Sequence, residues 1–309
     1  MKVTYPTKVF SGEAQIKEAA ARLRAGDLVV FPTETVYGLG AHALDISAVE
    51  KIFAAKGRPR TSPLIVHVAS VAAAQELVTV WPDAAQKLAT QFWPGPLTLV
   101  LPKRAVVPDL VTAGFATVAI RVPSHPVALE LLREAGIPVA APSANMFMRL
   151  SPTAREHVPF DGVLVLEGGD AEIGIESTVL SLVGPPRLLR PGAITRAKLE
   201  GVIGVIGKEL AAAGESPGLH PHHYQPRTPL LWAGAELPSG QGGYVFITEE
   251  RSAARSIRMP ADPTQYASRL YRTLHDLDRE GIEWIAVERL PPNEEWAAVQ
   301  DRLNRAARY

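Results

Sequence analysis

The chain has no cysteine and no excess of charge of either sign. The lack of cysteine excludes disulfides, thiolate nucleophiles and zinc sites of the cysteine type. The 32 Lys and Arg balance 32 Asp and Glu, so no overall field draws the protein to nucleic acid or to an acidic membrane surface. Any anion-binding site must therefore be local, built from a few cations placed close together.

Long apolar runs are also missing. No stretch of about 18 consecutive apolar residues occurs, and residues 1–8 contain no apolar core of a secretion signal. We therefore expect a cytoplasmic protein. Hydrophobic residues make up 47% of the 309, which is typical of a folded globular chain. This length exceeds the ~100–200 residues of one domain, so two domains are expected.

The order of predicted elements indicates an α/β protein. Apolar spacing predicts helices over 12–25, 47–55, 84–90, 126–135 and 195–201, and strands over 28–31, 64–68, 97–101, 117–122, 139–141, 163–166, 178–182 and 187–189. Because strands and helices do not alternate strictly, we expect a twisted mixed sheet with flanking helices. Ser47 to Glu50 has the Ser-x-x-Glu pattern of a capping box, which predicts that a helix begins at Ser47.

A linker rich in proline and glycine follows this region. Residues 214–229 show no apolar periodicity, so we divide the chain into a catalytic domain over 1–207, a linker over 208–228 and a small Rossmann-like α/β domain over 229–309. In the last part we expect strands over 244–248 and 284–288 and amphipathic helices over 262–280 and 293–307, as a β-α-β-α unit.

Two polar segments are candidates for chemistry. Residues 56–63 carry three cations and two hydroxyls but no acid, a composition suited to a polyphosphate, although a solvated basic turn is the plainer interpretation. Residues 32–40 follow a strand directly and place Thr33, Glu34 and Thr35 where α/β proteins bind ligands. The same segment could be an ordinary turn in which Gly38 and Gly40 supply unusual backbone angles. It is not a Walker A loop, because the Gly-Lys-Ser/Thr ending is absent.

These segments belong to a series that resembles the threonylcarbamoyl-AMP synthase family in its two-domain form. The matching segments, in chain order, are Pro32–Gly40, Lys56–Val68, Thr117–Pro123, Ala141–Asn145, Ser151–Thr153, Glu176–Val179, Arg190–Gly192, Ser216–Gly218 and His223–Pro226. The resemblance implies a nucleotidyltransferase that converts L-threonine, bicarbonate or CO₂, and ATP into L-threonylcarbamoyladenylate and pyrophosphate. The product would serve modification of the tRNA adenosine next to the anticodon. A downstream tRNA-modifying transferase complex would then be a partner, while direct binding of tRNA is left open.

The resemblance also implies the site residues. Those assigned to threonine are Thr35, His67, Arg121, Ser143 and Ser177. Those assigned to ATP are Lys56, Arg58, Ser62, Thr117, Ala141, Asn145, Ser151, Arg190 and Tyr224. Among them Lys56, Arg58 and His67 are the candidates for catalytic roles, although His67 in an apolar strand could equally be a satisfied core histidine. Mg²⁺ would accompany the triphosphate, held by phosphate oxygens and water, with no protein ligand assigned.

The chain departs from the family in two places. Phe147 and Met148 stand where the family usually has a Ser-Gly pair, which predicts an altered loop; the neighbouring Arg149 could contact phosphate or be solvated. His220 and His222 stand where the family often has Lys or Arg. They favour a solvated loop over a metal site, because nearby carboxylates are lacking.

Three other functions compete with this interpretation. An RNA-binding module without ATP turnover would use the same cations on a concave face, but the zero net charge and the lack of an RNA-recognition aromatic motif argue against it. A carbamoyl-transferring maturation factor would carry zinc-binding cysteine modules, which this chain lacks. The C-terminal unit could also be only an interaction domain.

Overall fold

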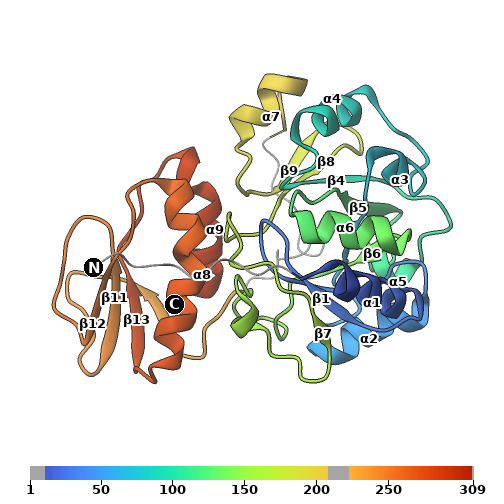
Figure 1. The fold of residues 1–309 in the computed structure, drawn as a ribbon. Helices are drawn as coiled ribbons and strands as arrows, with labels where there is room; N and C mark the ends of the chain where they lie inside the picture. The colour runs from blue at the N-terminus through green and yellow to red at the C-terminus, as the bar shows by residue number, and fades with distance from the viewer. Residues whose placement is uncertain (1–10, 208–222, 308–309) are drawn as a thin grey trace.

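The computed structural model describes residues 11–207 and 223–307, so Ser216–Gly218, His220 and His222 lie outside the described residues. Figure 1 shows two units, each built on its own sheet. The first has a 9-stranded sheet in the order β7-β1-β2-β6-β3-β5-β4-β8-β9, and the second a 4-stranded sheet in the order β10-β13-β11-β12.

Parallel and antiparallel pairs are mixed in the larger sheet, as predicted. Its strands are β1 (Val29–Phe31), β2 (Gly38–His42), β3 (Ile65–His67), β4 (Leu97–Pro102), β5 (Thr117–Arg121), β6 (Val139–Ala140), β7 (Leu164–Val165), β8 (Thr178–Ser181) and β9 (Arg187–Arg190). The β3–β5 and β4–β8 pairs are parallel, whereas β2–β6 and β4–β5 are antiparallel. The expected fold class is confirmed.

Helices cover both faces of this sheet. They are α1 (Glu13–Arg24), α2 (Ile46–Lys56), α3 (Val71–Gln75), α4 (Asp83–Phe92), α5 (Asp109–Thr112), α6 (Pro126–Ala135) and α7 (Arg196–Ile203), with a 3-10 turn at Arg155–His157. Strand β1 shows the two faces: Val29 and Phe31 pack with the α1–α6 pair, while Val30 packs with α2. A sheet buried on both sides explains why its strands read as short apolar runs.

An ordinary turn was the alternative interpretation of residues 32–40, and the structure instead places Gly38 and Gly40 in strand β2. Gly38 and Gly40 do not have positive φ, so they do not supply unusual backbone angles. A Cβ on Gly40 would come within 2.8 Å of the Phe31 ring and 2.9 Å of Val139. Glycine is therefore needed there because side chains from neighbouring strands cross the backbone closely.

The start of α2 also differs from the prediction. The helix begins one residue before Ser47, and Asp45 is its N-cap: the carboxylate accepts hydrogen bonds from Ser47 N at 2.9 Å and Ala48 N at 3.3 Å. The Ser47-to-Glu50 capping box is therefore wrong, because an acceptor two residues earlier already satisfies the first free amides. Gly57, with φ 61°, ends the helix and leads into the cationic segment.

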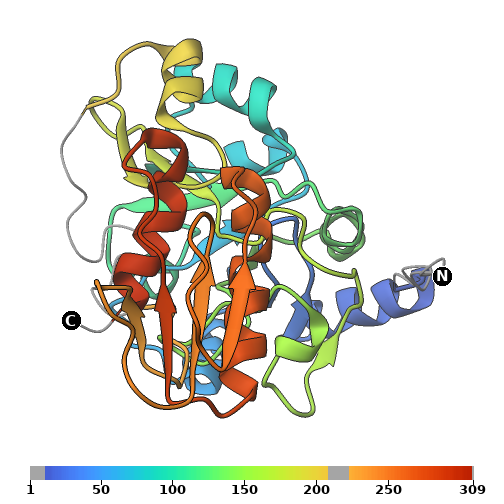
Figure 2. The same cartoon turned by 90° about the vertical axis from the view of Figure 1, so that its left-hand side faces the viewer.

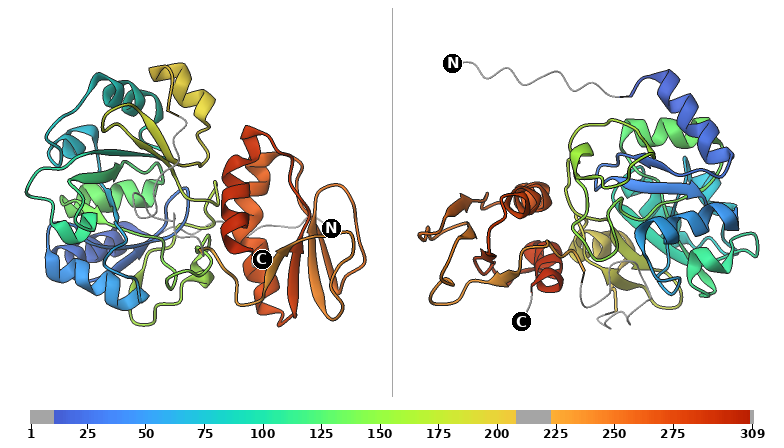
Figure 3. Two further views of the ribbon diagram at one scale, coloured as in Figure 1. Left: turned by 180° about the vertical axis from the view of Figure 1, so that it is seen from behind. Right: turned by 90° about the horizontal axis from the view of Figure 1, so that it is seen from below.

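The second unit is a parallel sheet covered by helices on the side that faces the first unit (Figures 1 and 2). Its elements are β10 (Leu230–Trp232), β11 (Gly242–Phe246), β12 (Arg255–Arg258), α8 (Pro263–Arg279), β13 (Trp284–Val287), a 3-10 turn (Glu294–Trp296) and α9 (Ala297–Ala306). The predicted β-α-β-α unit omitted β10 and β12. Figure 3 shows α8 and α9 as the layer between the small sheet and the larger unit. Within the described ranges, no helix is long and apolar enough to cross a membrane.

Asp45→Ala should lower the free energy of unfolding by about 0.5–2 kcal/mol, since it removes the acceptor for two amides of α2. Ser47→Ala is the matched control, and its effect should stay below about 0.5 kcal/mol. Urea denaturation measures both. A larger loss for Ser47→Ala would restore Ser47 as the cap.

Candidate functional site

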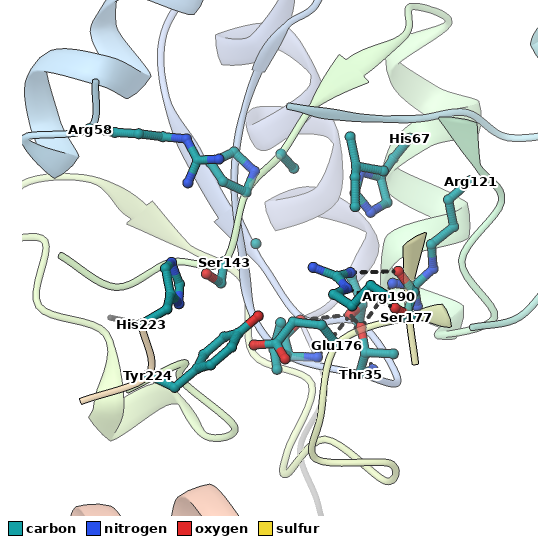
Figure 4. A pocket seen from close by; sticks show the side chains of 16 residues that line it. Thr35, Arg58, His67, Arg121, Ser143, Glu176, Ser177, Arg190, His223 and Tyr224 are labelled. Atoms are coloured by element: carbon teal, nitrogen blue, oxygen red, sulfur yellow. Dashed lines mark hydrogen bonds between the residues drawn. The ribbon is translucent and has the colours of Figure 1, made fainter. Parts of the chain in front are cut away.

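A cavity of ≈ 50 Å³ opens where several strands of the larger sheet end (Figure 4). The parallel pair β3–β5 brings His67 level with Arg121 at the carboxyl ends of both strands. The loop between β1 and β2 adds Thr35, and the segment before β8 adds Ser177. Segments far apart in the sequence thus meet at one edge of the sheet, where open α/β sheets bind ligands.

Most of the residues predicted from the sequence lie around this cavity. The lining includes all five residues assigned to threonine, Thr35, His67, Arg121, Ser143 and Ser177. From the ATP set it includes Arg58, Ala141, Arg190 and Tyr224. The cavity lining does not include Lys56, Ser62, Thr117, Asn145 or Ser151.

Arg121 is held at one side of the cavity by three contacts. Its guanidinium donates from Nε to Gly95 O at 3.1 Å and from Nη1 to Thr35 Oγ1 at 2.9 Å, and its Nη2 lies 2.5 Å from Glu34 Oε1 as an ion pair. Burial alone would raise the pKa of Glu34, but Arg121 outweighs it and the pKa is lowered. Glu34 was expected at a ligand-binding strand end, and its ion pair holds the guanidinium of Arg121 in place.

His67 is buried beside Arg121. Burial and the neighbouring guanidinium lower its pKa to about 3, so the imidazole is neutral at pH 7. Its Nδ1 finds no hydrogen-bond partner among the described residues. A neutral ring can offer one donor or one acceptor to a small ligand without adding charge.

Lys56 lies beside the cavity rather than in its wall. Its ammonium donates to Ser143 O at 2.6 Å and to Asn145 O, and so ties down the loop after β6. Burial, together with the positive charge of Arg58, lowers the pKa of Lys56. The lysine therefore shapes the loop that presents Ser143.

Two arginines give the cavity its positive charge. Arg58 donates from Nη2 to Pro63 O at 3.0 Å, and burial lowers its pKa to about 10, which leaves it charged at pH 7. Arg190 donates from Nε to Ser177 O at 3.0 Å and from Nη2 to Ser177 Oγ at 3.1 Å (Figure 4). The hydrogen bonds that Arg58 donates to Ser62 O and Pro63 O go to neutral backbone oxygens, which do not cancel its charge.

The other residues assigned to ATP are set back from the cavity. The β3–β5 register pairs Ile65 with Ala119, which puts Thr117 level with Pro63, at the far end of these strands from His67. Asn145 donates its amide to Met146 O and Arg149 O. Ser151 is buried, and its hydroxyl donates to Glu176 at 2.5 Å.

Two residues that line the cavity had no predicted role, although both stand in the segments that carried the resemblance. Glu176 precedes Ser177, and His223 precedes Tyr224. The His223 ring meets the Phe147 ring edge-on, with centroids 5.9 Å apart. Burial, followed by the charge of Arg58, lowers the pKa of His223 to about 3, so it is neutral at pH 7.

The loop that departs from the family has an unusual backbone. Met148 has φ 68°, a left-handed conformation that suits glycine, and its carbonyl accepts a hydrogen bond from Gln225 N at 2.8 Å. Arg58 lies over the Phe147 ring at 5.8 Å. Arg149 is exposed and lines a separate cavity of ≈ 480 Å³ rather than the one described above.

This geometry suits an anionic substrate and a small polar one side by side. Arg58 and Arg190 offer charge, Thr35, Ser143 and Ser177 offer hydroxyls, and no group of metal-ligating side chains occurs among residues 11–207 and 223–307. Such a lining can position reactants and neutralise charge.

Comparisons with known proteins agree with the motifs. The family described as "Telomere recombination" matches residues 21–192, and that described as "Threonylcarbamoyl-AMP synthase, C-terminal domain" matches residues 194–308. A threonylcarbamoyl-AMP synthase of Bacillus subtilis is 42% identical, covering 96% of this chain and 94% of its own, and one of Pyrococcus abyssi is 40% identical, covering 96% and 95%.

Comparison of structures agrees with the comparison of sequences. The crystal structure of P. abyssi Sua5 complexed with L-threonine superposes with a TM-score of 0.88 at 39% identity, covering 96% of this chain and 95% of that one. Similarity therefore extends through both sheets. The chain belongs to the threonylcarbamoyl-AMP synthase family, in its two-domain form.

Proposed function

We propose that this protein forms L-threonylcarbamoyladenylate and pyrophosphate from L-threonine, bicarbonate or CO₂, and ATP, in the cytoplasm, for threonylcarbamoyl modification of tRNA. The observation that carries the proposal is the lining of one cavity by two pairs: Arg121 with Thr35, and Arg58 with Arg190. In Figure 4 Arg190 lies beside Thr35 and Ser177, and Arg58 lies across the cavity from them. The first pair suits the carboxylate and hydroxyl of threonine, and the second suits phosphate.

The reaction needs two steps. The threonine amine first adds to CO₂ and loses a proton to become an N-carboxylate; starting from bicarbonate, the same N-carboxylate forms with loss of one water. A carbamate oxygen then attacks the α-phosphorus of ATP; a new oxygen–phosphorus bond forms, the α–β bridge breaks, and pyrophosphate leaves. Both steps depend on positioning and charge neutralisation more than on a nucleophilic side chain. Arg58 and Arg190 would counter the charge that develops on the phosphates, while neutral His67 orients the amino acid.

Mg²⁺ would bind together with the triphosphate rather than to side chains of the protein. The two buried carboxylates at the cavity, Glu34 and Glu176, are each engaged by an arginine, Arg121 and Arg302, so neither is free to be a strong ligand. Phosphate oxygens and water would therefore hold the ion, which would neutralise part of the phosphate charge.

The segment at His223 and Tyr224 is the end of the 208–228 linker that we propose as a strap over the site. Tyr224 is buried with φ 61°, and its hydroxyl has no hydrogen-bond partner among the described residues. With ATP bound, the strap would exclude water from a hydrolysable acyl-phosphate. The labile product would then pass to the downstream transferase complex.

Release of pyrophosphate should require both threonine and bicarbonate. Replacing threonine by valine should lower kcat/KM by at least about a hundredfold, because hydroxyl groups that recognise a hydroxyl would be left unpaired. Coupled pyrophosphate detection with single amino acids measures this. Equal release with valine would refute the amino-acid assignment but not ATP use.

Arg58→Ala should lower kcat/KM for ATP by about tenfold to a hundredfold, which corresponds to the ~1.5–3 kcal/mol of a charge-assisted contact. Arg60→Ala is the matched control: its side chain is 68% exposed and pairs with Glu50, so the change should be below about 0.5 kcal/mol. Steady-state kinetics with varied ATP decides the comparison. Indistinguishable variants would mean that the orientation of this loop toward ATP is wrong.

Tyr224→Phe should raise KM for ATP, and Tyr224→Ala should in addition release more free AMP, since the ring closes the strap and the hydroxyl contacts phosphate. The expected loss for Phe is about tenfold. Tyr244→Phe is the control, because it removes another buried hydroxyl without a described partner, in the second unit. Wild-type kinetics for both Tyr224 variants would show that the segment is an inert spacer.

A further inference from the structure

Glu176 is an acid in a site built for phosphate. It lines the same cavity as Arg58 and Arg190 and is 7% exposed. A buried carboxylate at this position would repel a triphosphate, because charges interact strongly where water is excluded. The negative charge of Glu176 therefore needs a cationic partner.

The compensation comes from the second unit. Arg302 of α9, 1% exposed, donates from Nε to Glu176 Oε2 at 2.8 Å and from Nη2 to Glu176 O at 3.3 Å. Its Nη1 donates to Pro191 O at 2.9 Å, directly after the cavity residue Arg190. Tyr271 of α8 adds its hydroxyl to Glu176 Oε2 at 3.2 Å.

Arg302 and Tyr271 also contact Tyr224, in the described end of the linker. Arg302 lies over the Tyr224 ring at 5.4 Å, and the Tyr271 ring lies 5.9 Å from that ring, tilted by 33°. Glu176 in turn accepts the hydroxyl of Ser151 at 2.5 Å, so one carboxylate joins the ATP-side loop to both helices of the second unit. Burial would raise the pKa of Glu176, but Arg302 and then Arg190 outweigh it, so the carboxylate is ionised at pH 7.

We propose that Arg302 is a positioning residue of the ATP site: the second domain supplies it to neutralise Glu176, so that Glu176 can orient Ser151 without repelling the triphosphate. This inference rests on the proposed function. It gives the second domain a defined task in the reaction, in place of a role as a separate interaction module. Arg302 itself does not line the cavity, so it acts through Glu176.

The pH dependence of a variant separates charge compensation from packing. In Arg302→Met the acid loses its ion-pair partner and keeps only the weaker influence of Arg190, so burial raises its pKa. At low pH the acid would be protonated and harmless; as pH rises it would ionise and repel ATP. KM for ATP should therefore increase with pH in this variant, by about tenfold or more between about pH 6 and pH 9, and stay flat in the wild type.

The decisive comparison adds Glu176→Gln. In the double variant Glu176→Gln/Arg302→Met, no unpaired acid remains at the cavity, because Asp301, the other ion-pair partner of Arg302, still pairs with Arg305. The amide keeps an oxygen acceptor for Ser151, so KM for ATP should return to within about threefold of wild type at every pH. Arg302→Lys should also retain a flat profile. Arg272→Met is the matched control: it breaks ion pairs of α8 with Glu156 and Asp170 across the same interface, remote from the cavity, and should leave KM unchanged.

Threonine-dependent pyrophosphate release and fluorescent-nucleotide binding are measured on all variants, with melting curves to confirm folding. A wild type without threonine-dependent release would refute the proposed function. An active wild type whose Arg302→Met variant has normal, pH-independent KM would overturn only the inference. If Arg302→Met does not fold, the double variant decides: a folded double variant with KM still raised more than about tenfold would show that Arg302 acts by packing.

Discussion

The burial of positive charge is the constraint on which this structure depends. A cation removed from water without partners costs far more than one hydrogen bond returns, so each buried guanidinium or ammonium needs acceptors. The chain provides them in two ways. Lys56 and Arg58 donate to backbone carbonyls, whereas Arg121 faces the carboxylate of Glu34. A carbonyl leaves the charge of Arg58 uncancelled, while a carboxylate offsets that of Arg121.

The second domain faces the first domain with its helices (Figure 3), and one of its own side chains fills the position where a ligand would bind. Open parallel sheets bind ligands beyond the carboxyl ends of their strands. At that position after β11, the carboxylate of Glu288 accepts from the amides of Ile247, Thr248 and Glu249 at 2.5–3.4 Å. The Glu288 carboxylate therefore already accepts the hydrogen bonds that these amides would donate to a bound anion. What this domain presents to the rest of the molecule is its helical layer, and Arg302 is the most buried cation of that layer.

Sequence patterns predicted those parts of the fold whose cause is local. The amphipathic helices and apolar strands lie within a few residues of the expected limits, because burial on one or both faces dictates their periodicity. Strand β2 was not predicted, because its Gly40 is required by close contacts with side chains that are distant in the sequence. Strand β12 was not predicted, because Arg255–Arg258 is a polar strand at the edge of its sheet. In the site, residues inside the motifs could be named. The pairing of Glu176 with Arg302 could not, since it joins residues 126 positions apart across two domains.

The loop at Phe147 and Met148 has a backbone conformation typical of glycine although it carries two bulky residues. Bulky residues in place of Ser-Gly predict a changed backbone, yet Met148 adopts φ 68°, a conformation that costs a non-glycine residue roughly 1–2 kcal/mol. Two contacts offset that cost: Gln225 N donates to Met148 O, and the Phe147 ring lies between Arg58 and His223. A serine could not make the ring contacts. Phe147 therefore adds ring contacts to both Arg58 and His223 at the edge of the cavity.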